Sequence, residues 1–450
     1  MRICFVLNSA YFFRYIDGVV RRLRAHGHDV VLVIGEGPVS RNYTDRAVEA
    51  CVTEAGCTRA SLHVPRSLAG RLMPRVRDLA GYANYFRSGH PAPGWTRQWR
   101  TYLDKRVQRL LANAVVHGLV VSAPGRALLK SIDRLLPANS SVAARVSALR
   151  PDVVVAMPMV FPASGDVEYA KAAHALGIPT VFAVGSWDHL GGKGLCPLVP
   201  DAVLVWNEEM AWEAAALHDI PRERIAVVGA PSFDFWFDAT PTIDRDSFLG
   251  TAGLDADSRY FVYLCSSNPI AGDTEPRFVA KLAAAMTGDP RLKGTQLLVR
   301  PYPAMNHLWN DVRIPNGSVW PPKGEWPDIP EARQNLFHTL HFSAGAIGVN
   351  TTAMLEAAVV GRPCISILTD EYRRSQADRA HFQQMLRGDF LETPRSSEEA
   401  VEIMAAILEG RDGKQQARRA FVRRFFRPLG DTQQVDTLYA EAIERAAARP

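Results

Sequence analysis

Apolar runs of strand length alternate with amphipathic stretches along most of the chain. The first run, Ile3–Leu7, is followed by a helical pattern that ends near Ala25, and a second run covers Asp29–Ile34. Such alternation predicts βα units that build a parallel sheet with helices on its faces. Similar runs predict further strands at 153–157, 180–184, 203–206, 225–228, 260–265, 295–299, 346–349 and 364–368.

The alternation is interrupted between residues 62 and 150, where the pattern is mostly helical, basic and aromatic. We interpret this stretch as a helical insertion in the first domain. A linker is predicted near Asp238–Asp246, and a last helix at 433–448 is expected to cross back over the first domain. The predicted units are an α/β domain at 1–238, a second α/β domain at 239–430 and a C-terminal crossover helix at 431–450.

Composition supports two domains. A chain of 450 residues, 47% of them hydrophobic, is too long for one core, so we expect two doubly wound, Rossmann-like domains that face a cleft. The apolar runs are too short to span a bilayer, and the scattered cysteines predict buried free thiols in a reducing compartment. The net charge is +5, and the basic stretches Arg66–Arg109 and Arg418–Arg427 can face either solvent or acidic lipid.

The most informative motif follows the apolar run at 346–349. Asn350, Thr351 and Thr352 open a predicted helix there, and Gly361 before Pro363 ends it. Amide groups at a helix opening, together with two hydroxyls, suit a phosphate group, and Glu356 one turn later could accept hydrogen bonds from a ribose. The alternative interpretation is that these residues only cap the helix.

A glycine-rich loop, Gly185–Gly194, follows the predicted strand at 180–184. It carries Ser186, Trp187, Asp188, His189 and Lys193. Ligands of open α/β sheets bind at the carboxyl ends of strands, so this loop is a candidate site. Asp188 is the candidate general base, with His189 as the competing candidate. The spacing does not fit a P-loop, and a purely structural loop is the alternative.

Two further strand ends carry polar side chains. Arg300 follows a strand and precedes Pro301, Tyr302 and Pro303, so its guanidinium could pair with a phosphate. Ser266 and Ser267 follow the predicted strand at 260–265 and would face the same edge. Each signal is weak by itself, because arginines and serines are common at strand ends.

Two familiar motifs are rejected. Asp255-Ala256-Asp257 has the form used by metal-dependent sugar transferases, but it precedes a strand, so a turn is predicted. The first strand–helix junction, Asn8–Arg14, lacks glycine, which argues against a dinucleotide fingerprint and a nicotinamide oxidoreductase.

The order of these segments resembles the GT-B glycosyltransferase and glycogen phosphorylase superfamily. Within it, the sequence is most similar to the bacterial surface-carbohydrate branch that includes the CDP-glycerol glycerophosphotransferases. The stretch from Ser186 to Gly194 resembles the SWDNLxxKG segment of that branch, and Asp188 stands near the histidine base of the WHGTPLK-like loop. Arg300–Pro303 resembles the RPHP motif, with Tyr302 in place of a histidine that helps hold the donor, which argues against glycerol phosphate transfer itself.

The resemblance implies a cytoplasmic enzyme, either free or peripheral on the inner face of the membrane, that transfers a group from a nucleotide sugar or a related nucleotide diphosphate donor. The acceptor would be a cell-envelope glycan or a lipid-linked precursor. The first domain would hold the acceptor and the second the donor, through Ser266, Ser267, Arg300, Tyr302, Asn350, Thr351, Thr352 and Glu356. We expect no metal, no cofactor and no nucleic acid partner.

Two alternatives stay open. One is a nucleotide-sugar 2-epimerase of the same fold, although Asn350-Thr351-Thr352 replaces its DSGG-type helix opening. The other is a non-catalytic binding subunit with a degenerate site. The sequence does not identify the base, the sugar, the acceptor, the stereochemical outcome, the oligomeric state or the role of the insertion.

Overall fold

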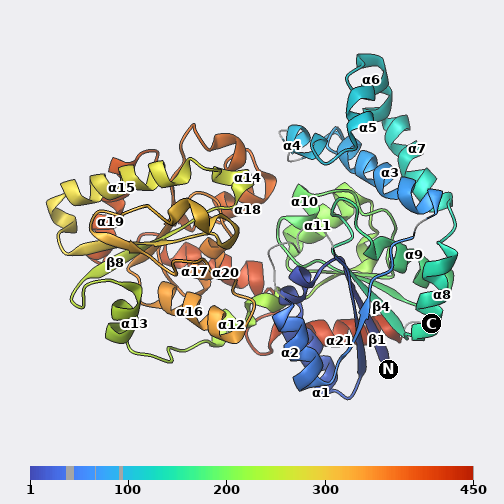
Figure 1. The fold of residues 1–450 in the computed structure, drawn as a ribbon, viewed down its shortest axis with the longest axis horizontal. Coiled ribbons are helices and arrows are strands. Elements are labelled where there is room, and N and C mark those ends of the chain that lie inside the picture. Colours follow the sequence, from blue (N-terminus) through green and yellow to red (C-terminus); the bar gives the residue numbers. More distant parts are fainter. Residues whose placement is uncertain (37–44, 66, 91–94, 449–450) are drawn as a thin grey trace. The chain divides into compact units, whose positions relative to one another are not determined.

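The computed structural model describes residues 1–36, 45–65, 67–90 and 95–448. Arg66, the first residue of one predicted basic stretch, lies outside these residues. The chain divides into two compact units, Met1–Asp234 with Phe425–Pro450, and Phe235–Arg424. Each is an α/β unit built on one parallel sheet, so the predicted fold class, with its helical insertion in the first unit, is confirmed (Figure 1). The predicted bounds at 238 and 430 stay a prediction.

The first unit contains a seven-stranded sheet in the order β3-β2-β1-β4-β5-β6-β7. Its strands are β1 (Arg2–Leu7), β2 (Asp29–Ile34), β3 (Thr58–Ser61), β4 (Val153–Met157), β5 (Thr180–Ala183), β6 (Ala202–Val205) and β7 (Ile225–Val227). Its helices are η1 (Ala10–Tyr15, a 3₁₀ helix), α1 (Asp17–Ala25), α2 (Arg46–Ala55), α8 (Ser140–Leu149), α9 (Asp166–Ala175), α10 (His189–Gly192), α11 (Glu208–His218), η4 (Arg222–Arg224), η5 (Pro231–Phe233) and α21 (Val435–Ala447).

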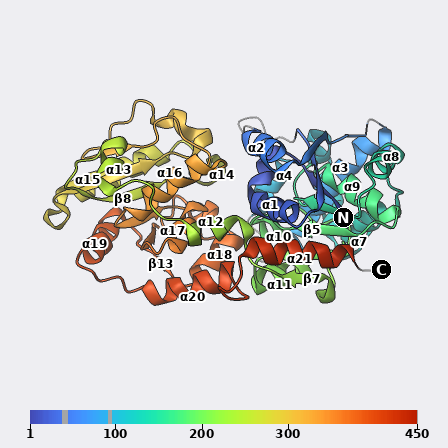
Figure 2. The same ribbon diagram turned by 90° about the horizontal axis from the view of Figure 1, so that it is seen from below.

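The sequence of these strands explains the layered arrangement. β4 is buried at every position and β1 at every position after Arg2, as expected for strands covered on both faces. Helix α9 packs on β4 from one side, and α21 also contacts β4, so the sheet lies between helical layers (Figure 2). Helix α11 begins after Asn207, whose side-chain oxygen accepts a hydrogen bond from the Met210 amide, as its sequence predicts.

The insertion between β3 and β4 is helical. It consists of α3 (Leu68–Asn84), α4 (Thr96–Arg100), α5 (Lys105–Leu110), α6 (Ala114–Val121), α7 (Ala123–Leu135) and α8. Helix α3 packs along α7, and α6 contacts both of them, whereas α8 returns to pack on α9 (Figure 1). A buried ion-pair network ties the insertion to the sheet layer, because Arg77 of α3 contacts both Asp133 of α7 and Glu168 of α9.

The second unit contains a six-stranded sheet in the order β10-β9-β8-β11-β12-β13. Its strands are β8 (Arg259–Leu264), β9 (Thr295–Arg300), β10 (Gly317–Val319), β11 (Gly345–Gly348), β12 (Cys364–Ser366) and β13 (Leu391–Glu392). Its helices are α12 (Asp234–Asp238), α13 (Arg245–Ala252), α14 (Asn268–Ala271), α15 (Glu275–Gly288), η6 (Pro290–Leu292), η7 (Pro303–Trp309), α16 (Pro330–His341), α17 (Ala353–Val359), η8 (Arg373–Ser375), α18 (Ala380–Arg387), α19 (Ser397–Leu408) and α20 (Gln415–Phe426).

The six cysteines are buried and free, as the sequence predicts. No helix within the described part of the chain is long and apolar enough to cross a bilayer.

Candidate functional site

The strand order of the second unit places three predicted site residues at one edge of its sheet. The chain runs from β8 outward to β10 and then returns to β11 on the other side of β8, so the order reverses between β8 and β11. Leu264 pairs with Gly348 on one side and with Arg300 on the other. Ser266 and Asn350 therefore leave neighbouring strand ends at the reversal, beside Arg300. Such a reversal is where open α/β sheets bind ligands.

Arg300 is the only arginine of the predicted donor residues, and its guanidinium is 6% exposed. Nη1 donates a hydrogen bond to Thr339 Oγ1 at 3.3 Å, and Nη2 lies 3.6 Å from the Glu325 carboxylate. Nη2 makes no hydrogen bond with any residue that the structure describes. Burial lowers the pKa of Arg300 to about 10, while Glu325 and Glu356 oppose that shift. A buried cation thus retains donor capacity at the ligand-binding edge.

Asn350 connects the ends of several elements. Its backbone N–H donates to Ser266 Oγ at 3.5 Å, and Nδ2 donates to the Ser375 carbonyl at 3.0 Å and lies 3.4 Å from His381 Nε2. The side-chain amide of Asn350 is therefore already hydrogen-bonded within this unit, and its role in donor binding stays a prediction. Asn350 positions the hydroxyls that follow it.

Thr351 and Thr352 are half-buried, directly before α17. Thr352 has helical backbone angles and its side chain does not cap the helix, so the capping interpretation does not account for this hydroxyl. Glu356 is buried one turn into α17, near enough to influence Arg300 electrostatically. Hydroxyls, a cation and a carboxylate therefore gather at the reversal between β8 and β11.

Ser266 is held by a carboxylate that the sequence did not single out. Both oxygens of Glu275 accept from the Ser266 amide at 3.0 Å, and one accepts from Tyr263 Oη at 3.1 Å. Burial raises the pKa of Glu275 to about 7. Ser266 is itself buried, whereas Ser267 stands before the short helix α14. Nothing in the spacing of Glu275 pointed to this contact, which forms only when α15 packs on β8.

Tyr302 follows Arg300 beyond Pro301. Its ring packs edge-to-face on Trp326, with 5.4 Å between the ring centres. Trp326 follows Glu325 in the chain. One loop therefore contacts both Arg300 and Tyr302. This loop, before α16, was not predicted to contribute to the site.

In the first unit, the Gly185–Gly194 loop holds Asp188 between two partners. Asp188 Oδ2 lies 2.9 Å from Lys193 Nζ, and Oδ1 accepts from Ser186 Oγ at 2.8 Å. Burial by itself would lower the pKa of Lys193, but the Asp188 carboxylate outweighs it and the pKa is raised. The Asp188 side chain keeps 25% of its surface exposed. The carboxylate is thus fixed in position and reachable from solvent.

His189 has a different environment. Its side chain is 2% exposed and lies among Phe12, Tyr15 and Phe161, with ring centres 6.2, 6.0 and 5.1 Å away. Burial lowers the pKa of His189 to about 4, so the ring is neutral at pH 7. Its Nδ1 makes no hydrogen bond with the described residues. Trp187 is likewise buried, edge-to-face with Phe425 at 6.5 Å.

The aromatic cage around His189 comes from the strand reversal of the first unit. The sheet order reverses between β1 and β4, and η1 with Phe12 and Tyr15 follows β1, whereas Phe161 follows β4. Arg14 stacks over Tyr15 at 4.9 Å. The first strand–helix junction lacks glycine, but nothing in its sequence indicated that its aromatic side chains would enclose His189.

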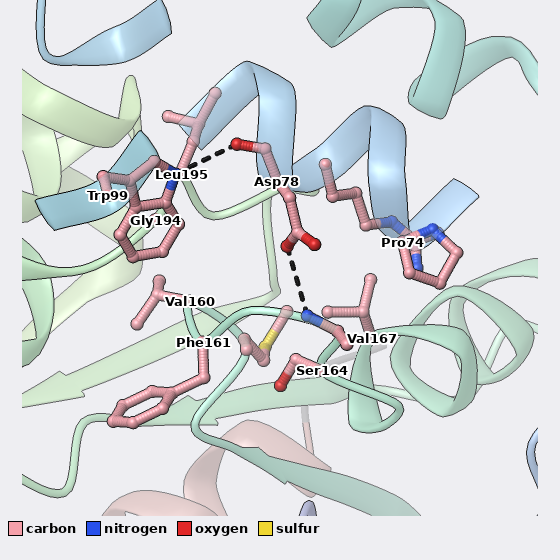
Figure 3. Close-up of a pocket in the computed structure, with 12 residues that line it drawn as sticks. Pro74, Asp78, Trp99, Val160, Phe161, Ser164, Val167, Gly194 and Leu195 are labelled. Atoms are coloured by element: carbon pink, nitrogen blue, oxygen red, sulfur yellow. Dashed lines mark hydrogen bonds between the residues drawn. The ribbon is translucent and has the colours of Figure 1, made fainter. Parts of the chain in front are cut away.

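A small cavity lies beneath this loop, between α3 and the segment after β4 (Figure 3). Its volume is about 10 Å³, which suits one water molecule and not a substrate. Asp78 borders it, accepts from the Ala163 amide at 3.1 Å, and has its pKa raised to about 6 by burial. The cavity wall also includes Phe161 and Gly194.

Two other groups lie away from these edges. Asp255 belongs to a turn before β8, where its carbonyl accepts from the Ser258 amide at 3.1 Å, so the predicted turn is confirmed. His26, His28 and Glu444 are the one described group whose ligand atoms lie close enough to hold a metal ion. It lies beside the start of β2, at the opposite sheet edge from Asp188.

Solved structures of other proteins share this architecture. UDP-GlcNAc 2-epimerase from Neisseria meningitidis bound to UDP-GlcNAc is 8% identical, with a TM-score of 0.55 and 99% of each chain covered. A glycosyltransferase from Rickettsia africae is 9% identical, with a TM-score of 0.55 and 100% of this chain and 99% of that chain covered. UDP-GlcNAc 2-epimerase from Methanocaldococcus jannaschii, in complex with UDP-GlcNAc and UDP, is 10% identical, with a TM-score of 0.53 and 99% and 100% covered.

The chain has a GT-B-like fold. The sequence matches no protein-family model and no curated protein. At these identities the similarity establishes the fold alone, and membership of the GT-B superfamily stays a prediction. The CDP-glycerol branch is not supported by these structures.

Proposed function

We propose that this GT-B-like protein transfers a sugar from a nucleotide diphosphate donor to a hydroxyl group of a cell-envelope glycan or a lipid-linked precursor. The donor would bind the second unit, and its diphosphate would lie at the edge formed by Ser266, Arg300 and Thr351–Glu356. The acceptor hydroxyl would meet Asp188 of the first unit. Structures of the same fold that hold UDP or UDP-GlcNAc support a nucleotide-sugar partner.

The buried guanidinium of Arg300 carries this proposal. A buried cation is costly unless it is paired, yet Nη2 of Arg300 lacks a hydrogen bond among the described residues and Glu325 is 3.6 Å away. A donor diphosphate would supply the missing oxygen acceptors in a charge-assisted contact. Thr351 and Thr352 would add hydroxyl donors, and buried Glu356 would accept hydrogen bonds from the ribose.

The reaction needs a base and a stabilised leaving group. Asp188 would accept the proton of the acceptor hydroxyl as the oxygen bonds to the anomeric carbon of the sugar. The bond from that carbon to the diphosphate would break, and the nucleotide diphosphate would leave with the electron pair. Arg300 and the two hydroxyls would stabilise the charge that develops on it, so the chemistry requires no metal ion.

Asp188 suits the base role better than His189. Its carboxylate is fixed by Lys193 and Ser186 and still reaches solvent, whereas the His189 ring is enclosed and its pKa is lowered to about 4. A base for a sugar hydroxyl needs a fixed position more than a high pKa, because proton transfer can run late along the reaction. The resemblance of SWDHLGGKG to surface-carbohydrate proteins supports an envelope acceptor.

A product analysis tests the proposal and separates it from its alternatives. The protein is incubated with a panel of UDP, CDP and GDP sugars and an extract of lipid-linked envelope precursors. Free nucleotide diphosphate together with a glycosylated precursor is the expected outcome. Release of an epimerised sugar would instead indicate a 2-epimerase, and nucleotide binding without any product would indicate a binding subunit.

A further inference from the structure

Helix α6 of the insertion exposes an apolar surface. Residues 110–125 contain no Asp, Glu, Lys or Arg, and α6 buries none of its residues. Leu110 at the end of α5 and Val115 and Leu119 of α6 are 62%, 72% and 66% exposed, and we call these three residues the apolar ridge. An exposed, uncharged run that contains three large apolar side chains is unusual for a surface covered only by water.

The orientation of α6 is fixed by its inner side. His117 Nε2 lies 3.1 Å from Tyr82 Oη, and its ring packs edge-to-face on Phe86 with centres 5.1 Å apart. These contacts hold α6 on α3. Val115 and Leu119 of the same helix stay exposed, so the ridge is a fixed feature of the insertion.

Cationic side chains lie beside the apolar ridge in the sequence. Lys105, Arg106 and Arg109 of α5 are exposed directly before Leu110. Residues 67–136 contain twelve Arg and Lys against three Asp and Glu, a net charge of +9, whereas the whole chain carries only +5. The insertion is therefore basic, and the rest of the chain has a small net negative charge.

A basic pocket lies between α3 and α7, the helix that continues from α6. Its volume is about 520 Å³, and its wall includes Arg87, Arg126, Lys130 and Arg134. Asp219 is the acidic side chain of the wall, 2.7 Å from Arg87 and 2.5 Å from Lys130. Four cations against one carboxylate leave a positive pocket that can take phosphate groups.

We propose that α5, α6 and α7 dock on an anionic lipid bilayer. The apolar ridge enters the boundary between headgroups and acyl chains, and the surrounding cations contact lipid phosphates. Charge selects this partner over a second copy of the chain, because two insertions of net charge +9 repel each other. The docking brings the enzyme to the surface where lipid-linked acceptors reside, but it does not depend on the proposed reaction.

Co-sedimentation of the full chain with vesicles tests this surface. The vesicles contain either phosphatidylcholine alone or phosphatidylcholine with about one third phosphatidylglycerol, which mimics an anionic leaflet. We expect binding only to the anionic vesicles, and weaker binding as salt is raised. Leu110→Gln/Val115→Gln/Leu119→Gln and Lys105→Glu/Arg106→Glu/Arg109→Glu should each weaken it by roughly tenfold or more.

Matched controls lie elsewhere on the surface. Leu176→Gln/Ile243→Gln/Leu429→Gln replaces three exposed apolar side chains, and Arg419→Glu/Arg423→Glu/Arg424→Glu reverses three exposed arginines of α20. Both controls should bind vesicles like the wild type. Binding to neutral vesicles alone, equal loss in the controls, or a dimer in solution that the ridge variant dissociates would each overturn the proposal.

Discussion

Asp188 and His189 are adjacent in the chain, yet their side chains have opposite surroundings. The carboxylate is a quarter exposed and paired with Lys193, while the imidazole is enclosed by aromatic rings. The sequence predicted a site in this loop because polar residues stand among glycines after a strand. It gave no reason to expect the cage, because Tyr15 and Phe161 join the loop only through the sheet order.

Asp188→Asn tests whether the Asp188 carboxylate is the catalytic base. The substitution keeps the shape and removes the basicity, so turnover with a cognate donor should fall by roughly 10²–10⁴ while nucleotide affinity stays nearly constant. Steady-state kinetics and nucleotide titration on the same preparation measure both. His189→Ala is the control, and near-normal turnover in Asp188→Asn alongside an inactive His189→Ala would transfer the role to the histidine.

At the scale of elements, the central strands and the edge strand β7 were predictable, whereas the edge strands β3, β10 and β13 were not. The runs at 29–34 and 153–157 coincide with β2 and β4, since strands buried on both faces read as continuous apolar segments. β3 and β10 at the sheet edges are largely exposed or half-buried, and their sequences, TRAS and GSV, carry no apolar run. β13 has only two residues. Contacts made by helix packing, such as Glu275 with Ser266, also left no local signal.

The β8–α15 junction should make stability depend on pH through Glu275. Its pKa is about 7 in the folded chain against an ordinary value of 4.5, so folding favours the protonated form. This contribution is present below pH 4.5 and is lost as the pH rises to about 7, by on the order of 3 kcal/mol. Glu275→Gln stays neutral, so it should lose less stability than the wild type between pH 5 and pH 8 in urea unfolding. Parallel curves for the two proteins would contradict this.

A buried ion pair links the C-terminal segment to the rest of the first unit. Arg427 Nη2 donates to Asp234 Oδ1 at 2.8 Å, and the other Asp234 oxygen accepts from the Asp436 amide, in the first turn of α21, at 2.8 Å. Asp234→Asn should cost about 3–5 kcal/mol, because it breaks the buried ion pair with Arg427. The exposed pair Arg222–Glu208 is the control, and Glu208→Gln should cost about 1 kcal/mol or less. Equal unfolding free energies for the two variants would refute the distinction.

At the scale of the whole molecule, the two-sheet architecture followed from the alternation of strands and helices, whereas the reaction did not. The same fold serves the epimerase and glycosyltransferase neighbours, so architecture alone does not select between them. The strand ends were predictable from the apolar runs, but the contacts that their side chains make were not.

Metal independence is a further prediction of the proposed function. The site residues proposed here include a guanidinium and hydroxyls for the diphosphate, and the described His26–His28–Glu444 group lies at the opposite sheet edge from Asp188. Activity with a cognate donor should therefore survive an excess of EDTA. Loss of turnover that manganese or magnesium restores would contradict the proposed stabilisation of the leaving group.

The central claim is that the second unit holds a nucleotide diphosphate at Arg300 and the hydroxyls before α17. Calorimetric titration of UDP, CDP and GDP, each beside its nucleoside, tests it most directly. One diphosphate should bind, and its nucleoside should bind more weakly. Thr351→Val/Thr352→Val should lower the diphosphate affinity by about tenfold or more through loss of two phosphate hydrogen bonds, and leave nucleoside affinity unchanged. Equal diphosphate affinity in the wild type and the variant would contradict this placement of the donor.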